Sequence, residues 1–228
     1  MYLELQAKGA LNINLVTPTH YAPHARIALD LARAQGMDLP IVWNTSGYET
    51  VRSIRENQGY ADVYLADFKY ASRKLAARYS KAPDYPQIAL DAIAAMVDEV
   101  GSPCFDEYEG DERMTRGVVV RHLMLPGALE DSMRVVRTVW ERFGNSVLLS
   151  VMNQYTPVLA DRANDGDAFA RRELKRCPEL SRRVPDGDYE RLLDFADSLG
   201  IDDYFWQEGG ASEESFIPAF DLEGVMSE

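Results

Sequence analysis

A repeated order of short apolar strand, polar turn and amphipathic helix is the feature that most constrains the fold of this chain. The first strand, at residues 12–16, runs through a turn at 17–21 into a helix with apolar residues at helical spacing. Further strands are expected in four later segments: 40–47, 62–70, 117–126 and 146–152. Strands that alternate with helices predict an α/β fold with a parallel sheet and right-handed crossovers. A complete eight-unit barrel takes about 250 residues, so five or six units predict a partial TIM-like (β/α) barrel with outer helices.

The remaining segments are interpreted from caps, spacing and turn residues. Residues 1–8 are expected to form a helix, although no Ser, Thr, Asp or Asn caps its start. Residues 102–116 are expected to be a solvated acidic loop, and residues 158–185 an irregular charged stretch. A sixth strand is expected at residues 203–206. No linker divides the chain, so residues 1–228 are interpreted as one domain that ends in an acidic tail at 209–228.

Composition excludes several classes of protein. The chain has 228 residues, of which 46% are hydrophobic and 27% charged, an ordinary balance for a globular protein. The net charge of −13 argues against a nucleic-acid partner, because a phosphate backbone requires clustered Lys and Arg. No run of about 18 apolar residues is present, so no membrane span is predicted. Two widely separated cysteines, Cys104 and Cys177, predict reduced thiols and a cytoplasmic location.

Charged side chains follow the third and fourth long strands. Asp67 and Lys69 are two residues apart, so both point to the same face of the sheet, at the end where barrels bind their ligands. Such a pair suits a zwitterionic or hydroxylated ligand, but it also fits a simple strand-end salt bridge. Arg121 and His122 point to opposite faces, so at most one of them faces the barrel axis. A buried structural imidazole is an equal alternative for His122.

Two further polar groups carry weaker signals. Asn44, Thr45 and Ser46 form a neutral turn that suits a ribose or a carboxylate, although such residues also form turns with no ligand. His20 and His24 are four residues apart, but the proline between them disfavours a regular helical metal pair. The glycine-rich nucleotide motifs and the nucleophile-elbow motif are absent from the sequence.

Taken in order, the strand ends resemble those of radical S-adenosylmethionine proteins of the pyruvate formate-lyase activating enzyme-like group. Five motifs carry the resemblance: residues 12–21 (NINLVTPTHY), 44–49 (NTSGYE), 64–70 (YLADFKY), 121–127 (RHLMLPG) and 154–157 (QYTP). The resemblance covers nearly the whole chain. It implies a partial barrel with a [4Fe–4S] cluster at its mouth, where S-adenosylmethionine is cleaved reductively to a 5′-deoxyadenosyl radical that abstracts hydrogen from a substrate.

The resemblance also implies roles for individual residues. Residues 17–20 take the place of the family's Gly-Gly-Glu turn, which meets the methionine amino group. Catalytic roles are implied for Asp67, Lys69 and Arg121. The implied cofactor-binding set is Thr17, Thr19, His20, Asn44, Thr45, Ser46, Asp67, Lys69, Arg121 and Gln154. The implied partners are a glycyl-radical enzyme or a small molecule as substrate, and an electron donor such as flavodoxin or ferredoxin.

The sequence departs from the family in one respect. The defining Cys-x-x-x-Cys-x-x-Cys is absent, and two cysteines cannot replace it. In the family this motif follows the first barrel strand, so the resemblance implies that this strand and the cluster loop precede Met1. The uncapped opening helix agrees with a truncated chain. The chain alone is therefore expected to bind no metal and to be inactive, and its open sheet edge is expected to self-associate.

Two other functions stay open. One is a cluster-free barrel enzyme of the aldolase type with Lys69 as the amine nucleophile, which requires a desolvated lysine. The other is a non-catalytic binding protein that retains only the fold.

Overall fold

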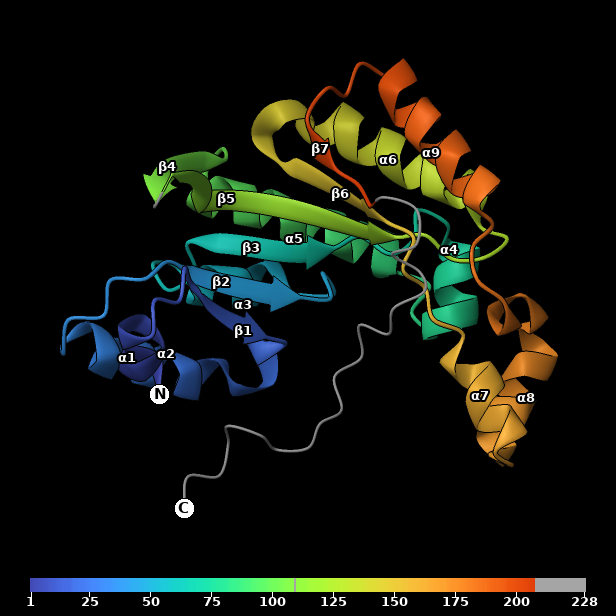
Figure 1. Cartoon of the computed structure of the whole chain (residues 1–228), viewed down its shortest axis with the longest axis horizontal. Helices are drawn as coiled ribbons and strands as arrows, with labels where there is room; N and C mark the ends of the chain where they lie inside the picture. The colour runs from blue at the N-terminus through green and yellow to red at the C-terminus, as the bar shows by residue number, and fades with distance from the viewer. Residues whose placement is uncertain (109, 208–228) are drawn as a thin grey trace.

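Six parallel strands form the central sheet of the computed structural model, which describes residues 1–108 and 110–207. Their spatial order follows their chain order (Figure 1): β1 (Ile13–Val16), β2 (Ile41–Thr45), β3 (Val63–Asp67), β5 (Asp111–Leu123), β6 (Leu148–Met152) and β7 (Tyr204–Phe205). A seventh strand, β4 (Cys104–Tyr108), pairs antiparallel with β5. The sheet is open, with β1 and β7 at its edges among the described residues. The predicted α/β class and the predicted sixth strand are confirmed.

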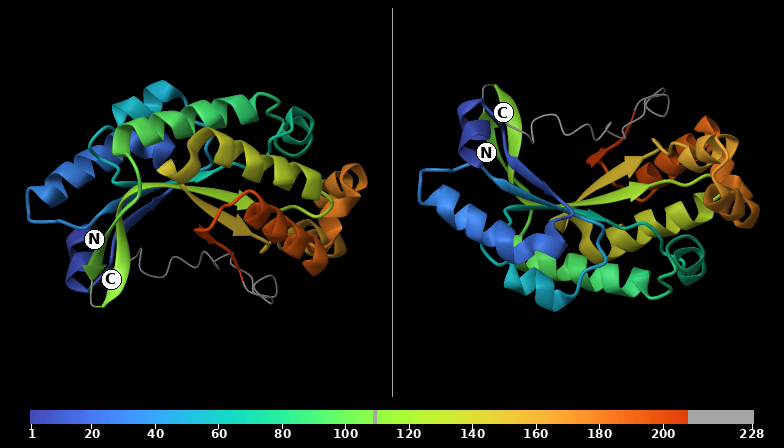
Figure 2. Two further views of the ribbon diagram at one scale, coloured as in Figure 1. Left: turned by 90° about the horizontal axis from the view of Figure 1, so that it is seen from above. Right: turned by 90° about the horizontal axis from the view of Figure 1, so that it is seen from below.

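Helices cover one face of this sheet. Figure 2 shows four of them along the same side: α2 (Ala22–Arg33), α3 (Val51–Glu56), α5 (Tyr85–Val100) and α6 (Leu129–Phe143). A further helix, α9 (Asp186–Ser198), packs on α6. The main core lies between these helices and the sheet, and its largest fully buried side chains include Trp43, Tyr64 and Phe68. A smaller cluster under α2 joins Ile13 to Leu29.

Strand alternation determines which residues face the helices. In β5, Val118, Val120 and His122 are buried on the helix side, so Arg121 between them points to the opposite, open face. In β3 and just beyond it, Tyr64, Ala66 and Phe68 are fully buried in the core, so Asp67 and Lys69 share the open face with Arg121. The two-residue period therefore separates an apolar face under the helices from a face that carries charged groups at the strand ends.

The interpretation of residues 102–116 as a loop was wrong. This segment forms a β-hairpin, because β5 begins at Asp111 and β4 pairs along its first part. Arg113 donates to Asp106 across the two strands at 2.8 Å, and Gly110 makes the turn at φ +94°. Asp106, Glu107, Asp111, Glu112 and Arg113 interrupt the segment, so it lacks the apolar alternation that marks a strand in sequence. Cys104 consequently lies in a strand, where its side chain is exposed.

The interpretation of residues 158–185 as irregular was also wrong. They contain α7 (Val158–Asn164), α8 (Ala168–Arg176) and the 3₁₀ turn η4 (Pro178–Ser181). Asp167 caps α8 by accepting hydrogen bonds from the backbone N–H groups of Phe169 and Ala170. This cap is a readable start signal, but the high charge of the segment obscured it.

Smaller elements complete the described chain. The opening helix α1 (Tyr2–Ala7) is present as expected. Between β1 and α2 lies the 3₁₀ turn η1 (Pro18–Tyr21), and η3 (Gly144–Ser146) leads from α6 into β6. After β3, a short helix α4 (Arg73–Leu75) continues into a π-helical turn, η2 (Ala76–Ser80). The predicted tail at 209–228 lies outside the described residues.

None of the helices within residues 1–108 and 110–207 is long and apolar enough to cross a membrane.

The free edge of β1 leads to a prediction about self-association. Val16 is 69% exposed at the end of this edge strand, and a groove of 580 Å³ lies beside β1 between α1 and α2. An exposed apolar edge is a template for pairing with another chain. Sedimentation velocity is expected to show concentration-dependent association of the wild type that Val16→Lys abolishes. Leu31→Lys, a matched charge on the exposed part of α2, should associate like the wild type, and a monomer at high concentration would contradict the prediction.

Candidate functional site

Four of the predicted site residues meet at the C-terminal ends of three adjacent strands. The Arg121 guanidinium donates to Oδ1 of Asn44 and to Oδ1 of Asp67, both at 2.7 Å. The Lys69 ammonium lies 3.5 Å from the second carboxylate oxygen of Asp67. Asp67 and Arg121 are register partners in neighbouring strands, which is why their side chains meet on one face. We call Asn44, Asp67, Lys69 and Arg121 the strand-end cluster.

The strand-end cluster is partly open to solvent. The side chains of Asp67, Arg121 and Lys69 are 23%, 24% and 39% exposed. Two cations share one carboxylate, so the cluster as a whole carries a positive charge. The buried Nε of Arg121 has no hydrogen-bond partner in the part of the chain that the structure describes. The cluster can therefore offer an acceptor to an ammonium group and donors to a carboxylate, within reach of one small ligand.

A buried carboxylate that sequence reasoning missed connects the first two strand ends. Glu49 is 6% exposed and accepts hydrogen bonds from the hydroxyls of Thr45, at 2.6 Å, and Thr19. Thr45 is 2% exposed, and its side chain is directed away from the strand-end cluster because Asn44, its neighbour, occupies the open face. Thr19 belongs to the same implied cofactor-binding set as Asp67, but its hydroxyl donates to Glu49 and not to the strand-end cluster. The Thr-x-x-x-Glu spacing in the loop was the available signal.

Tyr85 is a second missed residue, at the start of α5. Its hydroxyl oxygen accepts from the backbone N–H of Lys69 at 3.0 Å. The hydroxyl can donate its single proton to the carbonyl oxygen of Ser46 or to that of Asp67, which lie 2.9 and 2.8 Å from the hydroxyl oxygen. Burial raises the pKa of Tyr85 far above its usual range, so the hydroxyl remains a neutral donor. One side chain thereby holds the loop after β2 against the end of β3.

Gly47 allows this close approach. It has a φ of +74°, and a Cβ atom added to it would lie 2.1 Å from the backbone oxygen of Asp67. The loop after β2 therefore touches the main chain of β3 directly, and only a residue without a side chain fits. The position of the loop residue Ser46 relative to Asp67 depends on this contact.

His122 lies on the opposite face of the sheet from the cluster and contacts the main chain between Asp67 and Lys69. It is 2% exposed on the helix side, and its Nδ1 lies 3.0 Å from the carbonyl oxygen of Phe68, to which it donates as a neutral ring. Burial lowers the pKa of His122 below its usual 6.5. The expectation that Arg121 and His122 point to opposite faces is confirmed, and Arg121 is the residue on the open face.

The lowered pKa of His122 predicts a pH-dependent stability. The unfolded chain binds a proton near pH 6.5 while the folded chain resists it, so the free energy of unfolding falls as the pH decreases through that value. Urea denaturation from about pH 7 to about pH 5 should show this fall, at up to about 1.4 kcal/mol per pH unit. His122→Gln should show a weaker dependence, whereas His24→Gln, an exposed control, should match the wild type. Parallel stability curves for all three proteins would contradict the assignment.

The other predicted residues lie apart from the strand-end cluster. Thr17 is exposed after β1 in a left-handed conformation with φ +50°, and His20 is exposed in η1. The Ser46 carbonyl is held by Tyr85. Gln154 lies beyond β6, where its side-chain oxygen accepts from Gln207 at 2.8 Å. Thr17 reaches the cluster only through the main chain, where its N–H donates to the carbonyl oxygen of Asn44 at 2.8 Å. Within residues 1–108 and 110–207, the side chains of Thr17, His20, Ser46 and Gln154 make no hydrogen bond with those of the cluster.

Metal ligands are sparse in the described part of the chain. Within residues 1–108 and 110–207, no three His, Cys, Asp or Glu side chains form a group that could hold a metal ion. Cys104 is exposed in β4, while Cys177 is buried and receives a hydrogen bond from Nε of Arg78 at 3.4 Å. The two thiols are therefore in different environments and share no site.

Comparison with known proteins identifies a distant relative of unassigned activity. No family model and no solved structure matches the chain. It is 25% identical over 193 residues to an uncharacterized protein of Methanocaldococcus jannaschii, an alignment that covers 84% of this chain and 47% of that protein. The chain thus spans about half the length of this relative. The relative's name assigns no activity, so a functional proposal has to rest on the residues of the chain itself.

Proposed function

We propose that this chain is the ligand-binding part of a radical S-adenosylmethionine protein of the activating enzyme-like kind, and that its sheet is a partial TIM-like barrel. The observation that carries the proposal is the strand-end cluster, in which Arg121 joins Asn44 to Asp67 while Lys69 contacts the same carboxylate. Supporting it are the open sheet of six parallel strands and the position of the cluster at their C-terminal ends. These are the ends at which barrel enzymes bind their substrates.

The chemistry of the strand-end cluster fits the methionine end of S-adenosylmethionine. The Asp67 carboxylate accepts from an ammonium group, and the partly exposed Lys69 ammonium donates to a carboxylate. Asn44 has an amide nitrogen available to a ribose hydroxyl on the same face. A zwitterionic ligand can place its ammonium group at Asp67 and its carboxylate at Lys69. A simple anion or cation can use only one of these two groups.

The [4Fe–4S] cluster does not fit the cysteines of this chain. Such clusters are held by cysteine thiolates, and the chain has two cysteines in separate environments. No step through an iron–sulfur cluster is therefore assigned to these residues. Reductive cleavage of S-adenosylmethionine, with flavodoxin or ferredoxin as donor and a glycyl-radical enzyme or small molecule as substrate, requires thiolates beyond those of this chain.

Ligand binding tests the proposal directly. Isothermal titration calorimetry is expected to show weak binding of S-adenosylmethionine, in the millimolar range of about −4 kcal/mol. Asp67→Asn should weaken it at least about tenfold, because it removes a charge-assisted partner worth about 1.5–3 kcal/mol. Asp106→Asn changes a matched carboxylate in the β4–β5 hairpin and should leave binding unchanged. Absence of binding, or equal binding by both variants, would refute the proposed site.

Anaerobic reconstitution gives a second expected result. After incubation with iron and sulfide, the 228-residue chain should retain no stoichiometric iron and show no charge-transfer absorbance, because two separated thiols cannot hold the cluster. It should also release no 5′-deoxyadenosine from S-adenosylmethionine under reducing conditions. A brown preparation that cleaves S-adenosylmethionine would overturn this account of the chain.

The aldolase alternative is less well supported. Lys69 lies beside the Asp67 carboxylate and is 39% exposed, whereas an amine nucleophile is activated by desolvation or by a neighbouring cation. Borohydride trapping with carbonyl substrates should therefore leave Lys69 unmodified, and a trapped adduct at Lys69 would favour the aldolase.

A further inference from the structure

Two segments distant in sequence concentrate positive charge in an acidic protein. Residues 72–83 and 168–184 together carry ten of the chain's 24 Lys and Arg but two of its 37 Asp and Glu. Their net charge is therefore +8, while the whole chain has −13 and the remainder −21. The first segment contains α4 and η2, and the second contains α8 and η4. We call the exposed cations of these two segments the basic surface.

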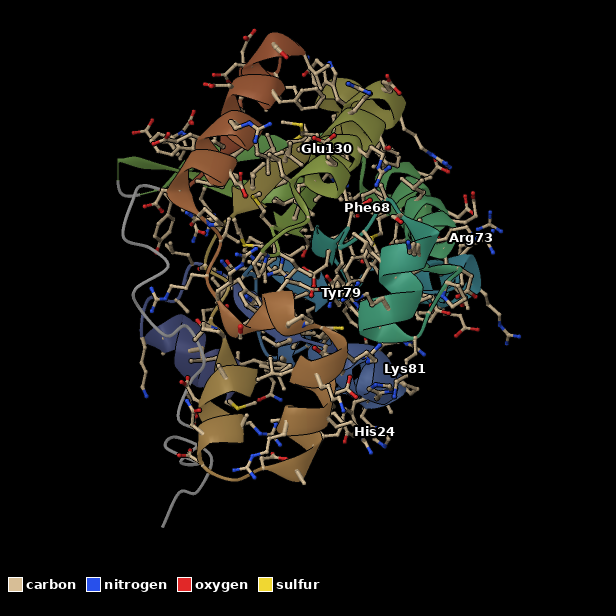
Figure 3. The ribbon with its side chains drawn as sticks, turned by 90° about the vertical axis from the view of Figure 1, so that its right-hand side faces the viewer. His24, Phe68, Arg73, Tyr79, Lys81 and Glu130 are labelled. Atoms are coloured by element: carbon tan, nitrogen blue, oxygen red, sulfur yellow. The ribbon has the colours of Figure 1, made fainter. Side chains whose placement is uncertain are left out.

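The two segments pack against each other. Arg78 of η2 makes an ion pair with Glu179 of η4 at 2.9 Å, and the Tyr79 hydroxyl donates to the same carboxylate at 2.6 Å. Arg78 also donates to the carbonyl oxygen of Arg176 at 3.0 Å. In Figure 3, Arg73, Tyr79 and Lys81 lie on the same face of the molecule as α8. The charges of the two segments thus belong to one surface.

The carboxylates of these segments are turned inward and the cations outward. Glu173 and Glu179 are only 15% and 18% exposed, and both are engaged, Glu173 by Arg176 and Glu179 by Arg78. Lys74 and Lys175, by contrast, are exposed and have no carboxylate within 4 Å among residues 1–108 and 110–207. The surface therefore presents cations whose charges are not neutralised by neighbouring groups.

An exposed aromatic ring lies within this surface. Phe169 is 48% exposed at the start of α8, and the Arg172 guanidinium stands over its ring at 5.4 Å. Arginine and aromatic residues are enriched at protein–protein interfaces and among the residues that dominate their affinity. The surface thus combines charge with an apolar anchor.

The negative charge around the basic surface indicates which class of partner can bind there. Exposed Asp161 of the adjacent α7 and exposed Asp165, which follows that helix, border it, and the rest of the chain is strongly acidic. A long polyanion that extended past the surface would meet repulsion, whereas a bounded acidic patch would not. We propose that the basic surface docks a second protein through an acidic patch that carries an apolar side chain.

The location of the basic surface gives this docking a consequence for the strand ends. The first segment begins three residues after Lys69, and α4, α7 and α8 lie beyond the arrowheads of the strands (Figure 1). A docked partner would therefore lie beside the end of the sheet that carries the strand-end cluster. The docking does not depend on which ligand that cluster binds.

Peptide probes of defined chemistry test the docking. Fluorescence anisotropy should detect binding of a peptide of alternating Glu and Leu, tighter than binding of poly-L-glutamate, and weakened about tenfold between about 50 mM and about 300 mM salt. Arg172→Glu and Lys175→Glu should each lower the affinity roughly three- to tenfold. Arg55→Glu, an exposed reversal on α3, should change it less than about twofold. Phe169→Ser should remove the advantage of the leucine-containing peptide.

Other results would overturn the docking. Absence of binding to both peptides would do so, as would equal effects of the Arg172 and Arg55 reversals. Tighter binding of a short DNA duplex or of phosphatidylserine vesicles would assign the surface to a different class of partner. Salt-sensitive self-association that Lys175→Glu abolishes would mean that a second copy of this chain occupies the surface. Circular dichroism of each variant would establish that it is folded.

Discussion

Replacing Gly47 with alanine is expected to lower the free energy of unfolding by about 3 kcal/mol. Two penalties combine at this position. The left-handed φ of +74° strains any residue with a Cβ atom, and that atom would lie 2.1 Å from the Asp67 backbone oxygen. Because backbone forms the contact, no side chain can move aside, and the loop after β2 has to separate from β3. Urea denaturation measures the loss.

A substitution at a second glycine, Gly59, distinguishes the cost of the left-handed backbone from the cost of the steric contact. Gly59 has almost the same φ, +78°, but no atom lies within 4 Å of the Cβ that alanine would add. Gly59→Ala should therefore cost only the conformational penalty, about 1–2 kcal/mol. Equal losses for the two variants would show that the contact between Gly47 and Asp67 does not constrain the strand ends.

Replacing Tyr85 with phenylalanine is expected to lower the free energy of unfolding by about 2–3 kcal/mol. The substitution leaves the ring in place but removes the partner of the Lys69 N–H group and of the Ser46 and Asp67 carbonyl oxygens. A buried polar group without a partner costs about 1–3 kcal/mol, and three such groups are affected. The strand-end cluster should loosen as well, so any ligand affinity measured there should fall together with stability.

Tyr60→Phe is the control for this second variant. The Tyr60 hydroxyl donates to Asp30 at 3.0 Å on the surface, where water can replace it. Its loss should cost less than about 0.5 kcal/mol. Similar destabilisation by the two substitutions would mean that the Tyr85 hydroxyl does not hold the strand ends together.

Local rules explain which parts of the fold could be predicted. The order of strands and helices follows from apolar spacing, and the shared face of Asp67, Lys69 and Arg121 follows from the two-residue period of a strand. These predictions use only neighbouring residues and the register of parallel strands. They needed no knowledge of distant contacts.

The groups that hold the strand ends together could not be predicted in this way. Tyr85 meets Ser46 across 39 residues, and Glu49 meets Thr19 across 30. Nothing in the spacing around either residue indicates its distant partner, and a tyrosine at the start of an apolar helix is usually a core residue. The β4–β5 hairpin was missed for a related reason, because Arg113 meets its partner Asp106 across the two strands.

The contacts of Tyr85 have a consequence for how this protein can diverge. Since one hydroxyl serves the main chain at Ser46, Asp67 and Lys69, a change at position 85 alters three positions at once. A related protein without a tyrosine there needs another buried donor in the same space, or a different loop after β2. Replacement of Gly47 also requires a compensating change, because β3 or the loop after β2 has to shift to make room for a side chain. In related proteins, substitutions at positions 47 and 85 should therefore occur together or not at all. The strand ends should then be conserved as a unit, while the sequences of the surrounding helices change more freely.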